Sequence, residues 1–282
     1  MTAVIILTLI GVLLGLAIAL TVRYFGAPVD PLAEQVAELM PGANCGACGF
    51  AGCNDYVQAM VSGKAKPGLC PSQSADALQK VCVLLGVASE GRAEKVAVVC
   101  CSGTDQYAIR RAFYNGVNDC HSAMLVAGGS KGCVYGCLGL GSCARACPFG
   151  AIEMRADHIA VVHPEICVGC GKCVTVCPRR IIKLVPKSAP VHVFCSSPEK
   201  APVKRKVCSA ACIGCRKCVK AAGENQMFIN GFLASVNYEN PPSADIVAVC
   251  PPKVLRTEAQ PAASAASAAP AAPEAPAATT AP

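Results

Sequence analysis

The strongest constraint on this chain of 282 residues is the spacing of the cysteines in CVGCGKCVTVCP, residues 167–178. They follow the pattern C-x2-C-x2-C-x3-C, with a proline directly after the last one, and are Cys167, Cys170, Cys173 and Cys177. Thiolates at this spacing are ligands of [4Fe–4S] clusters. Where two such runs occur, the fourth cysteine of each run binds the cluster of the other. The stretch therefore predicts a partner run.

The partner run is CVYGCLGLGSCARACPFG, residues 133–150, and it has one defect. Leu140, which cannot bind iron, occupies its second ligand position. The crossover rule still assigns the last cysteine of this run, Cys147, to the cluster of Cys167, Cys170 and Cys173.

The other cluster needs a replacement for the ligand missing at Leu140. The nearest spare thiol is Cys133, and the glycines of this loop give it the freedom to fold inward. We therefore expect a second set that consists of Cys133, Cys137, Cys143 and Cys177. A non-cubane site, or ligation by a remote cysteine such as Cys120, is the alternative.

A separate group of cysteines lies nearer the amino end, in NCGACGFAGC and a later LCP. Glycines between these cysteines allow tight turns around an inorganic core and expose N–H groups to its sulfurs. We expect a third [4Fe–4S] site here, held by Cys45, Cys48, Cys53 and Cys70. A structural zinc ion with four thiolate ligands is the alternative.

The last part of the chain resembles two cysteine runs from which half of the cysteines are missing, and the missing positions are related to each other. Ala222 stands where a fourth cysteine is expected, and the solitary Cys250 before Pro251 ends a run whose first three cysteines are absent. Under the crossover rule both losses belong to one cluster. A complete set remains, and it consists of Cys212, Cys215, Cys218 and Cys250. FINGFLASV between them predicts a hairpin with Asn-Gly at its turn.

These sixteen cysteines would hold about four clusters, out of 22 cysteines in the chain. Cys82 and Cys195 are interpreted as small buried hydrophobic residues. The roles of the other four cysteines are open; these are Cys100, Cys101, Cys120 and Cys208. Of these, Cys101, Cys120 and Cys208 could serve an additional cluster.

The amino end carries 20 uncharged residues, 3–22, close to the ~20 that cross a hydrocarbon core. The first charged side chain, Arg23, follows this stretch, whereas a cleaved signal peptide has basic residues before it. We expect a retained single-pass transmembrane helix; a signal peptide and a buried core helix are the alternatives. Arg23 and the need for reduced thiols favour a cytoplasmic location for the rest of the chain.

These features predict an α+β chain in which small cluster domains follow a membrane anchor. An amphipathic helix is expected at 30–40 with Asp30 as its cap, a strand at KVAVV, a helix around YAIRRAFY, a turn at GGSKG and a short hairpin between the two cysteine runs. The expected segments are a transmembrane anchor at 1–25, a small helical 4Fe–4S domain at 26–90, a connecting α/β segment at 91–132, a two-cluster domain at 133–185, a basic Pro-rich linker at 186–207, a degenerate single-cluster module at 208–256 and a disordered Ala/Pro-rich tail at 257–282.

Positive charge gathers between Arg179 and Lys220, where eleven basic residues accompany one acidic residue, Glu199. This stretch is either a solvated linker or a docking face for an acidic electron carrier such as ferredoxin, because complementary charge speeds encounter. The chain as a whole carries a formal charge of +7.

The combination of one membrane helix, CGxCGxxGC…CP, GCVYGCLGLGSC..ACPFGAI and a tandem of ferredoxin-type runs resembles the B subunit of the Rnf complex over about residues 1–255. The resemblance implies a bacterial-ferredoxin-like double-cluster domain and an iron–sulfur subunit of a membrane-bound, ion-translocating ferredoxin:NAD+ oxidoreductase. It also implies other membrane and peripheral subunits as partners. Leu140 and the shortened last run depart from the family pattern.

No GxGxxG after a strand, P-loop or catalytic-triad pattern is found, so we expect no nucleotide, flavin, nucleic acid or complete active site on this chain. Electron relay within a translocase is the expected function. A membrane-tethered polyferredoxin for another reductase and an iron–sulfur redox sensor are the alternatives.

Overall fold

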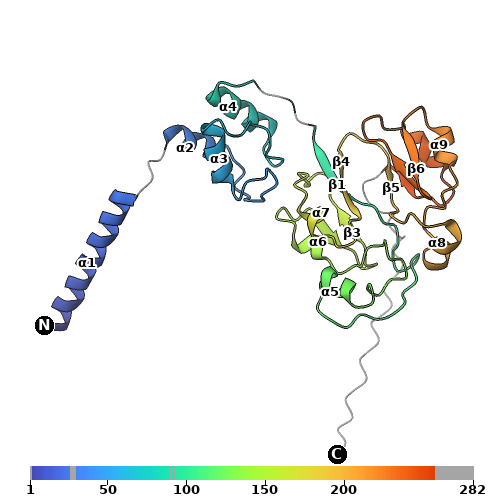
Figure 1. The fold of residues 1–282 in the computed structure, drawn as a ribbon, viewed down its shortest axis with the longest axis horizontal. Helices are drawn as coiled ribbons and strands as arrows, with labels where there is room; N and C mark the ends of the chain where they lie inside the picture. The colour runs from blue at the N-terminus through green and yellow to red at the C-terminus, as the bar shows by residue number, and fades with distance from the viewer. Residues whose placement is uncertain (1, 26–29, 89–90, 92, 258–282) are drawn as a thin grey trace, which may run out of the picture. The chain divides into compact units, whose positions relative to one another are not determined.

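The structure is a computed structural model that describes residues 2–25, 30–88, 91 and 93–257. The expected tail therefore lies outside the described residues, apart from Thr257. The chain forms two compact units, residues 1–91 and 92–282. Along the described residues, four helices come first, and short helices and two-stranded sheets follow in the second unit (Figure 1), which agrees with the expected mixture of helix and strand.

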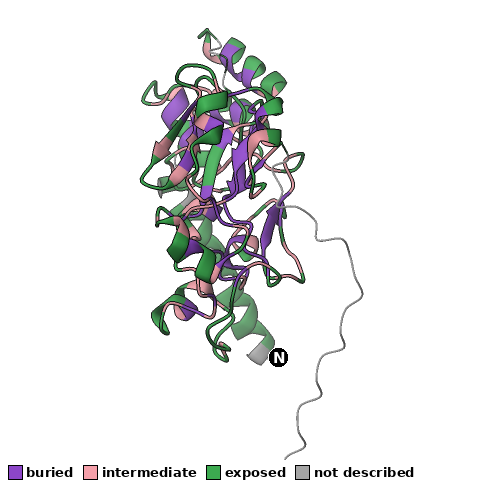
Figure 2. Cartoon of the chain, turned by 90° about the vertical axis from the view of Figure 1, so that its right-hand side faces the viewer, coloured by how far each residue is buried: buried purple, intermediate pink, exposed green. Residues whose placement is uncertain are grey.

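The apolar stretch at the amino end forms one helix, α1 (Thr2–Phe25). Its segment Val4–Thr21 has a mean hydropathy of 2.8 and no buried residue. In Figure 2 the part of α1 visible next to the label N is coloured as exposed. By length and composition α1 can cross a membrane.

Three further helices build the rest of the first unit: α2 (Pro31–Glu38), α3 (Cys53–Val61) and α4 (Ala75–Leu85). The sequence predicted α2 and its cap, since the Asp30 carboxylate accepts a 2.9 Å hydrogen bond from the backbone N–H of Leu32. The helices share a small core, which consists of Ala33, Val36, Met40, Tyr56, Val57, Met60, Cys70 and Val81.

The first half of the second unit contains two antiparallel strand pairs. The predicted strand KVAVV forms β1 (Lys95–Val99) and pairs with β4 (Ile182–Pro186). The predicted hairpin between the cysteine runs forms β2 (Ile152–Met154) and β3 (Ala160–Val162). Three short helices begin next to or within the cysteine groups: α5 (Cys120–Leu125), α6 (Ser142–Arg145) and α7 (Lys172–Val176).

The second half of this unit has a similar arrangement of strand pairs and short helices, with fewer cysteines. β6 (Met227–Asn230) and β7 (Leu233–Val236) form the predicted hairpin, whose two-residue turn is Gly231-Phe232, one position later than expected. The remaining elements are α8 (Ala201–Val207), α9 (Lys217–Ala221), the 3-10 helix η1 (Ala244–Val249), and the pair β5 (His192–Val193) and β8 (Leu255–Arg256).

Residues 186–207 are not the expected linker. They carry β5 and α8, and Val191 and Phe194 are fully buried. Lys204, one of the basic residues that suggested a solvated segment, is only 1% exposed. A segment that buries these side chains is part of the fold.

The prediction of a helix around YAIRRAFY is also wrong. Ala108 and Arg110 form isolated β-bridges with Cys208 and Lys131. The backbone of this segment is therefore hydrogen-bonded to distant parts of the chain, and it cannot also form helical bonds. The predicted turn at GGSKG is confirmed, with Gly128 and Gly129 at φ 74° and 85°.

Candidate cluster sites

In the first unit, the loop that carries the early cysteines is shaped by glycines and by Asn44. Gly46 and Gly49 have φ of 71° and 89°, a left-handed conformation that suits glycine. The Asn44 side-chain oxygen accepts a 2.8 Å hydrogen bond from the backbone N–H of Cys53, where α3 begins. This bond ties the cysteine loop to the start of the helix.

The same core holds the later cysteine of this group. The Tyr56 hydroxyl donates to Lys66 O and accepts from Leu69 N, which fixes the segment before Cys70. Burial raises the pKa of Cys70, and the nearby Cys45 and Cys48 thiols raise it further. Cys48, Cys53 and Cys70 all pack in or against the core of the first unit.

In the second unit, a cavity of about 380 Å³ lies under the defective run. Four of the residues that line it are cysteines, and they are Cys120, Cys137, Cys143 and Cys177. Burial, together with the neighbouring thiols of Cys137, Cys120 and Cys177, raises the pKa of Cys143 to about 12. Buried thiols this close to one another release their protons only when a cation compensates the charge.

In the structure, Cys133 lies apart from the group that it was expected to join. Cys133 does not line the cavity that holds Cys137, Cys143 and Cys177, but a different one. Cys120, the remote alternative, takes the fourth place. The physical reason is that the segment before Cys133 is bonded elsewhere, since Lys131 is bridged to Arg110.

Cys120 is held in place by a small polar network. The Asp119 carboxylate caps α5 by accepting from Ser122 N at 2.9 Å, and it also accepts from the Ser142 hydroxyl at 2.8 Å. The backbone N–H of Cys120 donates to the same hydroxyl at 2.8 Å. These hydrogen bonds from Ser122 and Ser142 lower the pKa of Asp119 to about 2. The start of α5 is thereby joined to α6, which carries Cys143.

The crossover cysteine Cys147 lies with the intact run. Burial, together with the thiols of Cys167, Cys170 and Cys147, raises the pKa of Cys173 to about 12. The backbone N–H of Ala97 in β1 donates to the Cys167 sulfur at 3.4 Å. The structure therefore brings these four cysteines together beside β1.

The degenerate module has a cavity of its own, of about 360 Å³. The cysteines that line it are those expected from the spacing: Cys212, Cys215, Cys218 and Cys250. Burial, together with the thiols of Cys212, Cys250 and Cys215, raises the pKa of Cys218 to about 11. Cys215 is exposed, whereas the other cysteines of the chain are buried or partly buried.

These cavities fit an iron–sulfur cube better than a polar ligand. Apart from the cysteines, the first is lined mainly by apolar side chains such as Val99, Leu138 and Ile182, which suits a cluster held by thiolates. Among the described residues, no three His, Cys, Asp or Glu side chains form a group that would hold a single metal ion.

Comparison with known protein families gives two matches to this chain. The family described as "Putative Fe-S cluster" matches residues 40–72, and the "4Fe-4S dicluster domain" matches residues 132–181. The first range contains all four cysteines of the first unit's group, and the second contains both cysteine runs with Cys133.

Comparison with curated proteins gives relatives that extend over most of the chain. A Methanosarcina acetivorans protein, named as the B subunit of an ion-translocating oxidoreductase complex, is 37% identical over 87% of this chain and 94% of its own length. The B subunit of the Na+-translocating ferredoxin:NAD+ oxidoreductase complex of Acetobacterium woodii is 38% identical over 73% of this chain and 62% of its own. A proton-translocating counterpart of Clostridium ljungdahlii is 39% identical over 74% of both.

Proposed function

Since the chain belongs to the family of the Rnf complex B subunit, an iron–sulfur component of ion-translocating ferredoxin:NAD+ oxidoreductases, we propose that it relays electrons between reduced ferredoxin and the subunits that reduce NAD+. The observation that carries this proposal is the gathering of cysteines into separate, largely buried groups, most of whose members follow the spacing of cluster ligands. A [4Fe–4S] cube, when bound, takes up and returns one electron by a change in iron oxidation state.

We assign four ligand sets to these groups. One is the set of the first unit, at Cys45, Cys48, Cys53 and Cys70. The next two lie in the two-cluster domain: Cys147 with Cys167, Cys170 and Cys173, and Cys120 with Cys137, Cys143 and Cys177. The fourth is the set of the degenerate module, at Cys212, Cys215, Cys218 and Cys250.

The two sets of the two-cluster domain are neighbours. Among the thiols that act on the pKa of Cys143 is Cys173, which belongs to the other set. Cys143 and Cys173 begin the packed helices α6 and α7, and both sit in the core around β1. Proximity of this kind favours electron exchange between the two sites.

The exposed rim of the degenerate module is proposed as the docking face for an acidic ferredoxin. Cys215 is exposed, and Arg216, Lys217 and Lys220 beside it are exposed cations. Complementary charge would speed the encounter of an acidic electron carrier with this exposed ligand. Buried Lys204 does not contribute to this face.

The amino-terminal helix is proposed as a single-pass anchor in the cytoplasmic membrane. Arg23 follows the apolar segment, and basic residues next to a membrane helix favour the cytoplasmic side. The cysteine-bearing units would then lie where thiols stay reduced.

Deletion of residues 2–25 is expected to move the chain from the membrane to the soluble fraction, with its iron content unchanged. The reason is that α1 exposes its large apolar side chains, whereas the cysteine groups draw on residues from 45 onward. Fractionation after an alkaline carbonate wash, with iron quantitation of both fractions, measures this. A truncated chain that stays with the membrane lipid would argue against α1 as the anchor.

The function is tested on the anaerobically purified complex, with reduced ferredoxin as donor and NAD+ as acceptor. The proposal predicts that the EPR signals of this chain develop when ferredoxin is added and that NAD+ reduction depends on the chain. A tethered polyferredoxin would be reduced as well, but NAD+ reduction and co-purification with Rnf subunits would not depend on it. A redox sensor would show no electron throughput.

A further inference from the structure

A second cavity in the second unit gathers four cysteines that none of the four sets above uses. Its volume is about 420 Å³, similar to the 380 and 360 Å³ of the two cavities already described. The cysteines that line it are Cys101, Cys133, Cys195 and Cys208. They come from four separate segments, and no two of them share a recognisable motif.

Hydrogen bonds of the backbone and of one side chain bring these segments together. The N–H of Ile109 donates to Val207 O at 2.9 Å, next to Cys208, and the N–H of Gly132 donates to Ile109 O at 2.7 Å, next to Cys133. The Ser196 hydroxyl donates to Cys100 O at 2.7 Å, which joins the residues next to Cys195 and Cys101. The convergence of the four cysteines is therefore a property of the fold.

The cavity offers hydrogen bonds suited to thiolates. The Cys101 sulfur accepts from the backbone N–H groups of Gly103, at 3.3 Å, and of Cys137, at 3.4 Å. A Cβ on Gly103 would lie 3.5 Å from the sulfur of Cys101 and 3.8 Å from that of Cys208. Glycine at this position therefore leaves the space between the two sulfurs open.

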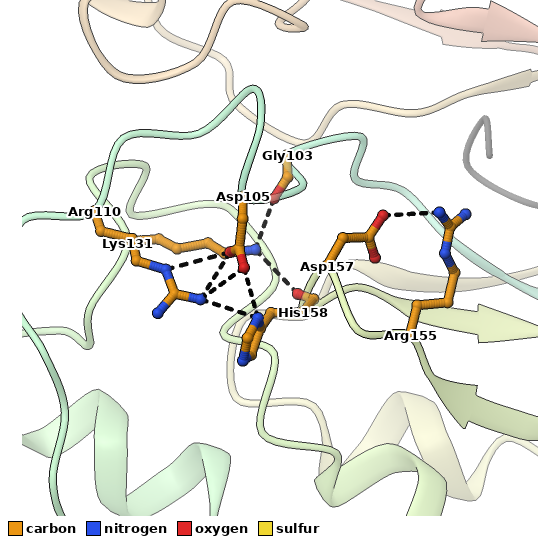
Figure 3. A network of polar contacts seen from close by, with 7 residues as sticks. All are labelled: Gly103, Asp105, Arg110, Lys131, Arg155, Asp157 and His158. Atoms are coloured by element: carbon orange, nitrogen blue, oxygen red, sulfur yellow. Dashed lines mark hydrogen bonds and ion pairs between the residues drawn. The ribbon is translucent and has the colours of Figure 1, made fainter. Parts of the chain in front are cut away.

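Two buried lysines at the cavity supply positive charge. Lys131 and Lys204 line it and are each only 1% exposed. The Lys131 ammonium donates to Gly103 O at 2.6 Å and to His158 O at 3.0 Å (Figure 3). The Lys204 ammonium donates to the carbonyl oxygens of Ser197 and Phe232 at 3.0 and 2.9 Å.

Neither ammonium forms an ion pair with a carboxylate within the described residues. A buried charge without a counterion is costly. An iron–sulfur cube with four thiolate ligands carries net negative charge, so it would provide the missing counterion for both lysines.

One buried polar atom at the cavity also lacks a partner. Ser102 lines the cavity and is 3% exposed, and its hydroxyl forms no hydrogen bond within the described part of the chain. An unsatisfied buried hydroxyl indicates a missing acceptor. The sulfurs of a bound cube would be such an acceptor.

We propose that Cys101, Cys133, Cys195 and Cys208 hold a further [4Fe–4S] cube, which brings the total for this chain to five. Its ligand Cys101 accepts a hydrogen bond from Cys137, a ligand of the two-cluster domain. Its ligand Cys195 packs against the core of the degenerate module, which includes the ligand Cys212. The site therefore connects the two-cluster domain to the degenerate module.

This place in the relay rests on the proposed function, whereas the existence of the site does not. The test is therefore to measure iron and acid-labile sulfide in the anaerobically purified full chain. This measurement does not depend on NAD+ reduction. We expect about 20 irons per chain, and about 16 after replacement of any one of the four cysteines with alanine, because a cube holds four irons. The EPR signal of one reduced cluster should disappear in the same variants.

Double variants test whether the four cysteines share one site. Cys101→Ala with Cys208→Ala should retain about 16 irons, as each single variant does, whereas Cys133→Ala with Cys137→Ala should retain about 12 because two cubes are lost. Cys100→Ala is the matched control, since Cys100 is equally buried beside Cys101 but does not line the cavity. It should keep all its iron.

Several results would overturn the proposal. One is an iron content of about 16 per full chain that stays the same in the single variants. Another is one equivalent of zinc in the full chain that is absent from the single variants. A third is a loss of about eight irons in the double variant of Cys101 and Cys208. Equal iron in the Cys133 single variant and in its double variant with Cys137 would place Cys133 in the neighbouring set instead. If one alanine variant does not fold, the other three decide the outcome.

Discussion

Replacement of Cys120 with alanine is expected to remove one [4Fe–4S] cube, about four irons per chain, and to stop ferredoxin-driven NAD+ reduction by the assembled complex. Cys120 lines the same cavity as Cys137, Cys143 and Cys177, and its backbone is tied to that run through Ser142. Without Cys120 only three thiolates remain there. Burial already holds the pKa of Cys143 at about 12, so the incomplete set binds iron poorly.

Cys82→Ala is the control for this experiment. Cys82 is 3% exposed in α4, packs as a small apolar side chain, and lines none of the cysteine cavities described above. Its replacement should leave iron and electron transfer intact. If Cys120→Ala keeps its full iron content while Cys133→Ala loses the cube that Cys137→Ala also loses, the fourth ligand of this set is Cys133 and not Cys120.

Gly169→Ala is expected to lower the free energy of unfolding by roughly 3 kcal/mol or more and to reduce the iron content by up to about four per chain. Gly169 lies between Cys167 and Cys170 with φ 68°, where a side chain costs about 1–2 kcal/mol. In addition, a Cβ there would overlap the carbonyl oxygen of Lys95 in β1. Backbone on both sides must then move, and the loop that presents these ligands moves with it.

Gly150→Ala separates the two contributions. Gly150 also has a left-handed backbone, with φ 64°, but a Cβ there would meet nothing within 4 Å. This variant should lose only about 1–2 kcal/mol and keep its iron. Anaerobic urea unfolding of both variants gives the comparison. If both variants lost the same free energy of unfolding, the close approach of the Gly169 loop to β1 would not contribute to the stability.

Two of the expected groups of cysteines follow from spacing, and the structure brings their members close together. Two residues separate Cys167 from Cys170 and Cys170 from Cys173, and the structure places Cys147 beside them. The same reasoning about coupled losses led to Cys212, Cys215, Cys218 and Cys250, which line one cavity. In both cases a local pattern and one rule about crossover sufficed to name the group.

Cys120 could not be found by spacing because it reaches its set through tertiary contacts. Its nearest partner, Cys137, is 17 positions away, and the bond that holds it runs through Ser142. The only local signal is Asp119, a good N-cap residue directly before it, which predicts that a helix begins there. A cap indicates where a helix starts, but not what the helix packs against.

The sequence suggested Cys101 and Cys208, but not Cys133 and Cys195, for an additional cluster, and two wrong interpretations concealed how their segments meet. Residues 107–114 have apolar and basic residues at helical spacing, yet their N–H groups bond to Val207 and Ser130. Residues 186–207 are rich in proline and lysine, yet they bury Phe194 and Lys204. Composition could not reveal either, because a lysine that balances a buried anionic site looks in sequence like any other lysine.

The most direct test of the crossed ligand sets is an iron anomalous map from an experimental structure of the full chain prepared without oxygen. We expect the Cys147 sulfur to bind the cube of Cys167, Cys170 and Cys173, and the Cys177 sulfur to bind the cube held from the other run with Cys120. Absence of iron at Cys147 and Cys177, or binding of each to a cube held only by its own run, would contradict the crossover.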